Sequence, residues 1–144
     1  MFNNYDNNKT NQTVKNSIEF LEKPVTADEV QVASLLERIV KAIVAKDLKM
    51  LISVYSDTAS IEMSTLRDAL LNKSEYEARM SKIIGNIRNI YFNNTIIRVT
   101  GQEAVISCIS NILLHGMAFS KKNQRYFKCV KEDGKWRIIE ARYI

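Results

Sequence analysis

The chain has 144 residues, a length typical of one domain, with 46% hydrophobic residues, 26% charged residues and a net charge of +5. This charge favours anionic ligands only mildly, and a nucleic-acid partner is not expected because nucleic-acid binders gather more basic charge on one surface. No apolar run approaches the roughly 20 residues that span a bilayer, and the N-terminal stretch is polar, so we expect no membrane partner and a cytoplasmic location.

The N-terminal stretch predicts a leader rather than folded structure. Residues 1–16 contain six Asn and little that could be buried, a composition typical of flexible segments. The following "SIEFLEKP" (17–24) has a small apolar cluster that could form a short helical turn before its proline. We therefore expect residues 1–24 to be a flexible leader and residues 25–144 to be the domain.

Two helices are predicted at the start of the domain. Residues 26–47 begin with a capping box, in which Thr26 is the N-cap and Glu29 lies three residues later. Their apolar residues recur at spacings of three and four and form one wide stripe: Val32, Leu35, Leu36, Ile39, Val40, Ile43 and Val44. A second, short helix over residues 48–55 follows Asp47, which we expect to cap it.

A short strand and a third helix come next. Residues 58–63, "TASIEM", have the alternation of a strand. Residues 72–87 are predicted to form a helix with Ser74 as its N-cap and Glu77 completing a second capping box. Gly85 marks the end of this helix.

The remainder of the chain is rich in β-branched and aromatic residues. Turn signals separate its segments: "TGQE" suits a two-residue type II′ turn with Gly101 first, and "KEDGK" precedes the last segment. The predicted strands cover residues 88–99, 104–115, 125–130 and 136–144. Helices followed by a run of hairpins indicate an α+β fold, with the helices packed on one face of a curved antiparallel sheet.

This order of elements resembles the nuclear transport factor 2-like superfamily, also called SnoaL-like or steroid-isomerase-like, over about residues 28–144. Three phrases carry the resemblance: "KAIVAKDLKMLISVYSDTASIEM" (41–63), "LNKSEYEARM" (71–80) and "KEDGKWRIIEARY" (131–143). The resemblance implies a cystatin-like α+β roll, in which a cone-shaped sheet wraps around three N-terminal helices and leaves a pocket at its open end. It also implies a homodimer. Trp136 and Ile138 would then lie in the core and anchor the closing strand to the helices.

Fold alone does not define function in this superfamily, so the positions used by its steroid isomerases are a useful test. Ungapped counting places Met63 at the position of the general base, Ile39 at that of the tyrosine oxyanion donor and Tyr126 at that of the protonated aspartate. Met and Ile cannot exchange protons, whereas Tyr126 could still donate to an oxyanion. The steroid-isomerase mechanism is therefore excluded.

Three residues remain candidates for catalysis. His115 follows a long strand and has the side chain best suited to proton transfer near neutrality, although a solvent-facing histidine is the alternative. Glu62 is the carboxylate nearest the family's base position, with a surface carboxylate as the alternative. Tyr126 is the third, and Asp57 is interpreted as a turn or cap residue.

Tyrosines suit a ligand pocket because they combine an apolar ring with a polar tip. We expect Tyr55, Met63, Tyr126 and Tyr143 to contact a ligand. The alternative for Tyr55 is a core position with its hydroxyl at the pocket rim.

The face presented by the last strand depends on the length of the "KEDG" loop. A three-residue loop with a bulge and a four-residue loop give opposite faces. We favour the four-residue loop, which sets Trp136 and Ile138 in one apolar layer with Phe127 and Cys129, and places Ile139, Ala141 and Tyr143 on the same face as Tyr126. Glu140 and Arg142 share a face, as a surface ion pair or as a charged pocket floor.

The thiols and the basic residues suggest no further chemistry. Cys108 and Cys129, which could lie opposite each other across a hairpin, lack metal-ligand spacing and an activating base, so we expect core thiols, no metal and no cofactor. "SKKNQR" (120–125), with Lys128 and Lys131, forms a basic edge that is more typical of a solvated hairpin than of a nucleic-acid surface.

Three functional hypotheses follow. The first is a protein that binds a small ligand in an apolar, tyrosine-lined pocket, with no assignable reaction. The second is an enzyme that catalyses proton transfer, dehydration or cyclisation on a small organic substrate. The third is a protein-interaction or oligomerisation domain, which a filled cone beside an exposed apolar sheet face would support.

Overall fold

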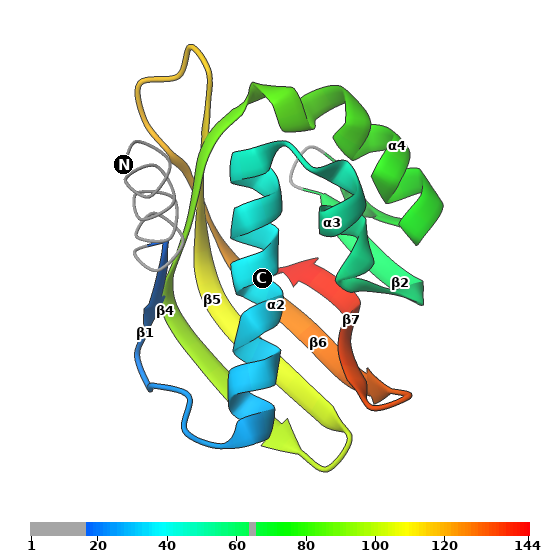
Figure 1. Cartoon of the computed structure of the whole chain (residues 1–144). Coiled ribbons are helices and arrows are strands. Elements are labelled where there is room, and N and C mark those ends of the chain that lie inside the picture. The colour runs from blue at the N-terminus through cyan, green and yellow to red at the C-terminus, as the bar shows by residue number, and fades with distance from the viewer. Residues whose placement is uncertain (1–16, 64–65) are drawn as a thin grey trace, which may run out of the picture.

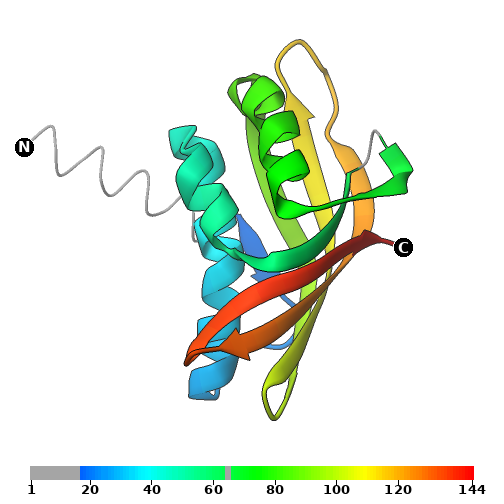
Figure 2. The ribbon, with the colours of Figure 1, turned by 90° about the vertical axis from the view of Figure 1, so that its right-hand side faces the viewer.

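The computed structural model describes residues 17–63 and 66–144, so the predicted leader residues 1–16 lie outside the described residues. Within these ranges, three helices pack against one seven-stranded sheet with the strand order β1-β4-β5-β6-β7-β2-β3. Figure 1 shows the sheet bending around the long helix α2, with α3 and α4 beside its upper half. Figure 2, turned by 90°, shows the same curvature from the side. The predicted α+β roll is confirmed.

The first two helices begin where their caps predict. In α2 (Ala27–Ala45) the Thr26 hydroxyl accepts from the backbone N–H of Glu29, whose carboxylate accepts in return from Thr26. In α3 (Leu48–Ser53) the carboxylate of Asp47 accepts from the N–H of Met50 at 3.1 Å. Eight residues of α2 are buried, which include six of the seven stripe residues. The amphipathic pattern therefore defines the face on which the sheet closes.

The third helix, α4 (Lys73–Ile83), corrects the predicted cap. Its N-cap is Asn72, whose side chain accepts from the N–H of Glu75 at 2.8 Å, rather than Ser74. Both pairs have the capping-box spacing, and Asn caps a helix as well as Ser does. A single 3₁₀ turn, η1 (Ile84–Asn86), follows at Gly85.

The strand β1 (Ile18–Phe20) corrects the predicted leader. It runs parallel to β4, and the N–H of Phe92 donates to the carbonyl of Ser17 at 2.7 Å. Ile18 is only 8% exposed and belongs to the core. The segment Ile18–Phe20 is therefore part of the sheet, where it pairs with the outer edge of β4 that would otherwise be open.

The next two strands form the opposite edge of the sheet. β2 (Tyr55–Met63) pairs in parallel with β7 and antiparallel with β3 (Leu66–Leu71), a strand that the sequence did not predict. Its stretch is leucine-rich without the β-branched residues that signal a strand. Pairing with β2 therefore overrides a weak local preference.

The remaining strands are joined by hairpins: β4 (Ile87–Thr100), β5 (Glu103–Leu114), β6 (Lys121–Glu132) and β7 (Lys135–Tyr143). The first turn has Gly101 at φ 63° in its first central position, as predicted. The last turn has only two central residues, Asp133 at φ 51° and Gly134 at φ 78°. Two left-handed residues define a type I′ turn, so both loop lengths weighed above are wrong.

A β-bulge in β7 decides which side chains face inward. Cys129 lies opposite Ile138, whereas Lys128 lies opposite Glu140, so Ile139 is an extra residue in β7. Because successive side chains alternate, one extra residue reverses the alternation beyond it. Trp136 and Ile138 share the buried layer as predicted, but Ala141 is also buried, contrary to the face we expected.

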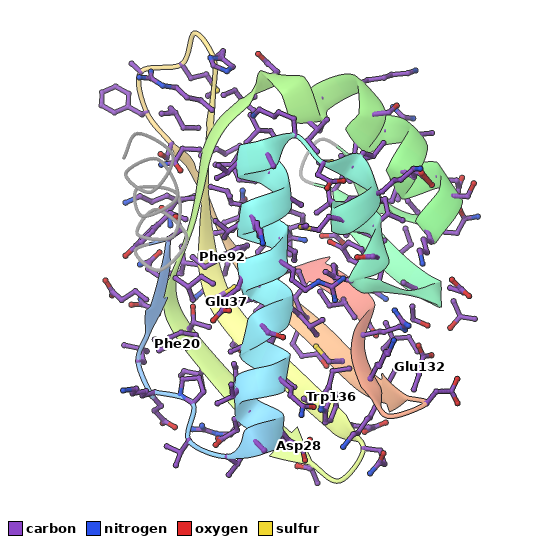
Figure 3. All side chains as sticks on the ribbon, viewed as in Figure 1. Phe20, Asp28, Glu37, Phe92, Glu132 and Trp136 are labelled. Carbon is purple, nitrogen blue, oxygen red and sulfur yellow. The ribbon has the colours of Figure 1, made fainter. Side chains whose placement is uncertain are left out.

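Trp136 closes the lower end of the core. Its ring is buried, and its Nε1 donates to Oδ1 of Asp28 at 3.1 Å in the first turn of α2. Lys131 lies 3.3 Å from the same oxygen, and the two hydrogen bonds lower the pKa of the Asp28 carboxyl. Figure 3 shows Trp136 and Asp28 together at this end of α2. The predicted anchoring of the closing strand to the helices is confirmed.

Candidate functional site

A cavity of about 310 Å³ lies between the helices and the inner face of the sheet. Its exposed lining residues are Ile83 at the end of α4, Asn86 in η1, Met117 in the β5–β6 loop and Lys121 at the start of β6. These four residues mark the mouth. The β5–β6 loop lies at the top of Figure 1, and Figure 3, in the same view, shows Trp136 at the opposite end. The cone is therefore closed at one end by the tryptophan and open at the other.

Most of the cavity wall is apolar. The helices contribute Ile39, Ile43, Leu51, Met80 and Ile83, and the sheet contributes Met63, Ile87, Ile90, Phe92, Ile112, Leu114 and Phe127. Ligand pockets combine such a wall with a few polar groups that fix the orientation of the ligand. The cavity can accept a small molecule that is mostly apolar.

Two tyrosines form a polar pair at the wall. Tyr55 and Tyr76 are both buried, their rings meet edge to face at 5.1 Å, and the Tyr55 hydroxyl donates to that of Tyr76 at 3.4 Å. Burial raises the pKa of both phenols, while the positive charge of Arg125 acts in the opposite direction on each. Both hydroxyls are therefore protonated donors near neutral pH.

Arg125 brings a positive charge to the inner face of the sheet. It is only 9% exposed, and its guanidinium carbon lies 4.7 Å from the ring centre of Phe127 and 4.4 Å from that of Tyr143. Its Nε is buried without a hydrogen-bond partner. Among residues 17–63 and 69–144, whose side chains the structure describes, no carboxylate forms an ion pair with Arg125.

Glu62 and Asn123 complete the polar lining. The Glu62 carboxylate accepts from the backbone N–H of Tyr143 at 3.1 Å, which holds it against the end of β7. Asn123 lies on the inner face of β6, two residues before Arg125. The described lining thus carries two cations, Lys121 and Arg125, and one carboxylate.

Several predicted site residues meet at this cavity. Tyr55, Met63, Tyr143 and the catalytic candidate Glu62 all line it, although β2 and β7 are far apart in the chain. They meet because β2 pairs directly with β7. Tyr143 reaches the inner face because of the bulge at Ile139.

Tyr126 and His115 are not brought to the cavity. Tyr126 alternates with the inward residues Arg125 and Phe127, and so it points to the outer face of β6. The prediction that it contacts a ligand is corrected by this alternation. His115 is exposed beyond the end of β5, where its backbone N–H donates to the carbonyl of Asn86 at 2.9 Å, and its side chain does not line the cavity.

Arg125 is the functional candidate that sequence reasoning missed. The sequence places Arg125 in the basic edge "SKKNQR", where the preceding lysines suggest that it is exposed. The available signal was its alternation with Phe127 and Cys129, both of which are buried. Of the three positions that ungapped counting aligned with the steroid isomerases, Ile39 and Met63 do line the cavity. The third is displaced by one residue, because the inward residue of β6 is Arg125 and not Tyr126.

The remaining candidates lie outside the cavity. Cys108 lies opposite Arg125 in β6, so the arrangement in which it would face Cys129 across the hairpin is not formed. Both thiols are buried, as expected, and burial raises the pKa of each to about 12. Glu140 and Arg142 form an ion pair at 2.9 Å and do not line the cavity.

The described residues form neither a metal site nor a membrane-spanning helix. No group of three or more His, Cys, Asp or Glu residues in the described ranges could hold a metal ion. In the part of the chain that the structure describes, no helix is long and apolar enough to cross a membrane.

Comparison with known proteins identifies the fold. No protein-family model and no curated protein matches the chain. An NTF2-like protein of unknown function from Pseudomonas putida aligns with a TM-score of 0.69 at 18% identity, covering 84% of this chain and 88% of that chain. A cystatin-like protein of unknown function from Nostoc punctiforme gives a TM-score of 0.69 at 14% identity, over 84% and 93% of the two chains.

A third structure is named provisionally as a ketosteroid isomerase, from Shewanella frigidimarina. It gives a TM-score of 0.64 at 12% identity, over 79% of this chain and 94% of that chain. Likeness at such low identity concerns the course of the backbone and not the chemistry of the site. The chain therefore has the nuclear transport factor 2-like fold, which is also described as cystatin-like.

Proposed function

We propose that the protein binds a small, mostly apolar molecule in the cavity of its cone. The observation that carries the proposal is an open cavity of about 310 Å³ whose wall is apolar except for a few inward polar groups. This volume is at the lower end of the range of about 300–1,000 Å³ that is typical of ligand pockets. In this proposal Tyr55, Met63 and Tyr143 contact the ligand. A cone filled by side chains would instead have supported an interaction domain.

A second candidate function is proton transfer on the bound molecule, with Glu62 as the base. The observation in its favour is that Glu62 is the carboxylate of the described lining and is held in place by the Tyr143 N–H. Tyr55 or Tyr76 would supply the hydroxyl that stabilises a developing oxyanion. Turnover of a bound compound that is lost in Glu62→Gln, with binding retained, would support this function.

The experiment for the proposed function is a thermal-shift screen of small organic acids, steroids, aromatic polyketide-like compounds and nucleotides. A ligand at 100 times its dissociation constant adds about 2.7 kcal/mol to stability, which is readily measured. Two variants on the same strand provide a matched pair. Ile112→Trp narrows the cavity, whereas Ile109→Trp places the same bulk on the outer face of β5. Stabilisation that survives in Ile109→Trp and disappears in Ile112→Trp is the expected result.

Stabilisation that is equal in the two variants would contradict the proposal, because the ligand would then bind elsewhere. The proposal also takes the protein to act as a homodimer, as the resemblance implies, and in the cytoplasm, as the sequence composition led us to expect. Light scattering on the purified chain would test the dimer, and a mass of one chain at all concentrations would exclude it.

A further inference from the structure

The wall of the cavity contains a buried positive charge, that of Arg125. Among residues 17–63 and 69–144, whose side chains the structure describes, Arg125 is the one charged residue that is buried. A buried charge normally has an opposite charge beside it, because an unpaired one costs more free energy than a fold readily recovers. Arg125 has no such partner among the residues with described side chains.

The surroundings of Arg125 define the direction in which a partner must lie. The rings of Phe127 and Tyr143 lie against the guanidinium, with their centres 4.7 and 4.4 Å from its central carbon. Aromatic rings stacked near a guanidinium do not use its N–H donors, which lie at the edge of the guanidinium plane. These donors form the fork that matches the two oxygens of a carboxylate. Arg125 is among the residues that line the cavity, and its buried Nε has no hydrogen-bond partner.

Further donors lie in the same part of the wall. Within the Tyr55–Tyr76 pair one hydroxyl donates to the other, which leaves the second proton without an acceptor among the described residues. The Asn123 side chain lines the cavity and has no hydrogen bond to another described side chain or backbone group. Glu62 is the opposing charge, but its carboxylate is held by the Tyr143 backbone and forms no ion pair with Arg125. The described lining therefore offers a hydroxyl and an amide donor beside the cavity, and no carboxylate that is ion-paired with Arg125.

We propose that the ligand is a small amphipathic carboxylate, whose anionic head accepts hydrogen bonds from Arg125 and whose apolar body lies against the isoleucine-rich wall. This inference rests on the proposed function and specifies the ligand class. A monoanion fits better than a phosphate ester, because the cavity is small and one guanidinium has no second buried cation beside it.

The test compares probes that share one apolar body. Octanoate, octanol, octylamine and octyl phosphate are titrated by calorimetry into the full chain and into Arg125→Met. A charge-assisted hydrogen bond lost from a buried site reduces affinity by about 10- to 100-fold. We expect octanoate to bind at least about tenfold more tightly than octanol. Arg125→Met should bring octanoate down to the affinity of octanol and leave octanol binding intact, which also shows that the variant is folded.

The outcomes separate this inference from the proposed function. If octanol and octanoate bind equally, and both are blocked by Ile112→Trp, the cavity binds ligands but the carboxylate inference is overturned. Tighter binding of octylamine or octyl phosphate than of octanoate overturns it as well. If no probe binds, or if binding is insensitive to Ile112→Trp, both proposals fail. Retention of the octanoate preference in Arg125→Met would show that another group recognises the head.

Discussion

Replacing Arg125 with Met should make the empty protein more stable. The guanidinium is 9% exposed and has no carboxylate partner among the described side chains, so its burial costs free energy that folding must recover elsewhere. Met keeps most of the volume and the flexible stem while removing the charge. A residue that is kept although it lowers the stability of the folded protein is typical of a binding site.

The magnitude follows from two opposing effects. The effective penalty for burying an ion is several kcal/mol, and contact with the rings of Phe127 and Tyr143 offsets it by up to about 2 kcal/mol each. We therefore expect Arg125→Met to raise the free energy of unfolding by about 1–3 kcal/mol. For a chain of this length the midpoint of thermal unfolding should rise by roughly 4 °C for each kcal/mol.

The assay is urea unfolding followed by Trp136 fluorescence, with equal m-values required for the comparison. Lys128→Met is the matched control, since it lies on the outer face of the same strand and its ion pair with Glu103 spans 3.8 Å at the surface. Removing an exposed pair should change stability by less than about 1 kcal/mol. A lower stability for Arg125→Met than for the wild type would refute the reasoning and show that the guanidinium is a net stabilising group.

Three further predictions concern the thiols, a helix cap and the first strand. The folded-state pKa of Cys108 and Cys129 is about 12, above the ordinary 9.0. The unfolded chain therefore loses these protons first, and stability falls as the pH rises from about 9 to about 12. At about pH 10 each thiol lowers the free energy of unfolding by about 1.4 kcal/mol. Between pH 8 and pH 10 the free energy of unfolding of the wild type should therefore fall by about 3 kcal/mol more than that of the double Cys→Ala variant. Equal decreases in the two proteins would contradict the burial of the thiols. Asn72→Ala should lower the free energy of unfolding, measured in urea, by about 1 kcal/mol, and Ser74→Ala should lower it by less than about 0.5 kcal/mol. The reverse order would show that Ser74 is the N-cap, as the sequence predicted. Ile18→Ala should cost about 2 kcal/mol, whereas a neutral effect would mean that residues 17–20 are a leader after all.

Features determined by neighbours in the chain could be predicted from the sequence. Thr26 and Glu29 lie three residues apart, Asp47 directly precedes its helix, and Gly101 opens a two-residue turn, so each signal and its effect lie within one turn of the chain. The α4 cap shows the limit of this reasoning. Asn72 and Ser74 begin equivalent capping boxes, and local sequence does not choose between them.

Features determined by pairing between distant segments could not be predicted in the same way. The three residues of β1 become a strand only because β4 presents an unpaired edge, and β3 depends likewise on β2. No local pattern in either short segment reports that edge, because the partner lies elsewhere in the sequence.

The candidate site shows the same division most clearly. The order and periodicity of the elements predicted an α+β fold, and the resemblance to the nuclear transport factor 2-like superfamily implied a roll with a pocket, in which tyrosines were the expected contacts. Which residues of β7 face it was decided by a type I′ turn at Asp133–Gly134 and one extra residue at Ile139. Side chains in a strand alternate with a period of two, so a single inserted residue moves every later side chain to the other face. Only the tertiary structure therefore places Tyr143 beside Arg125 in the cavity.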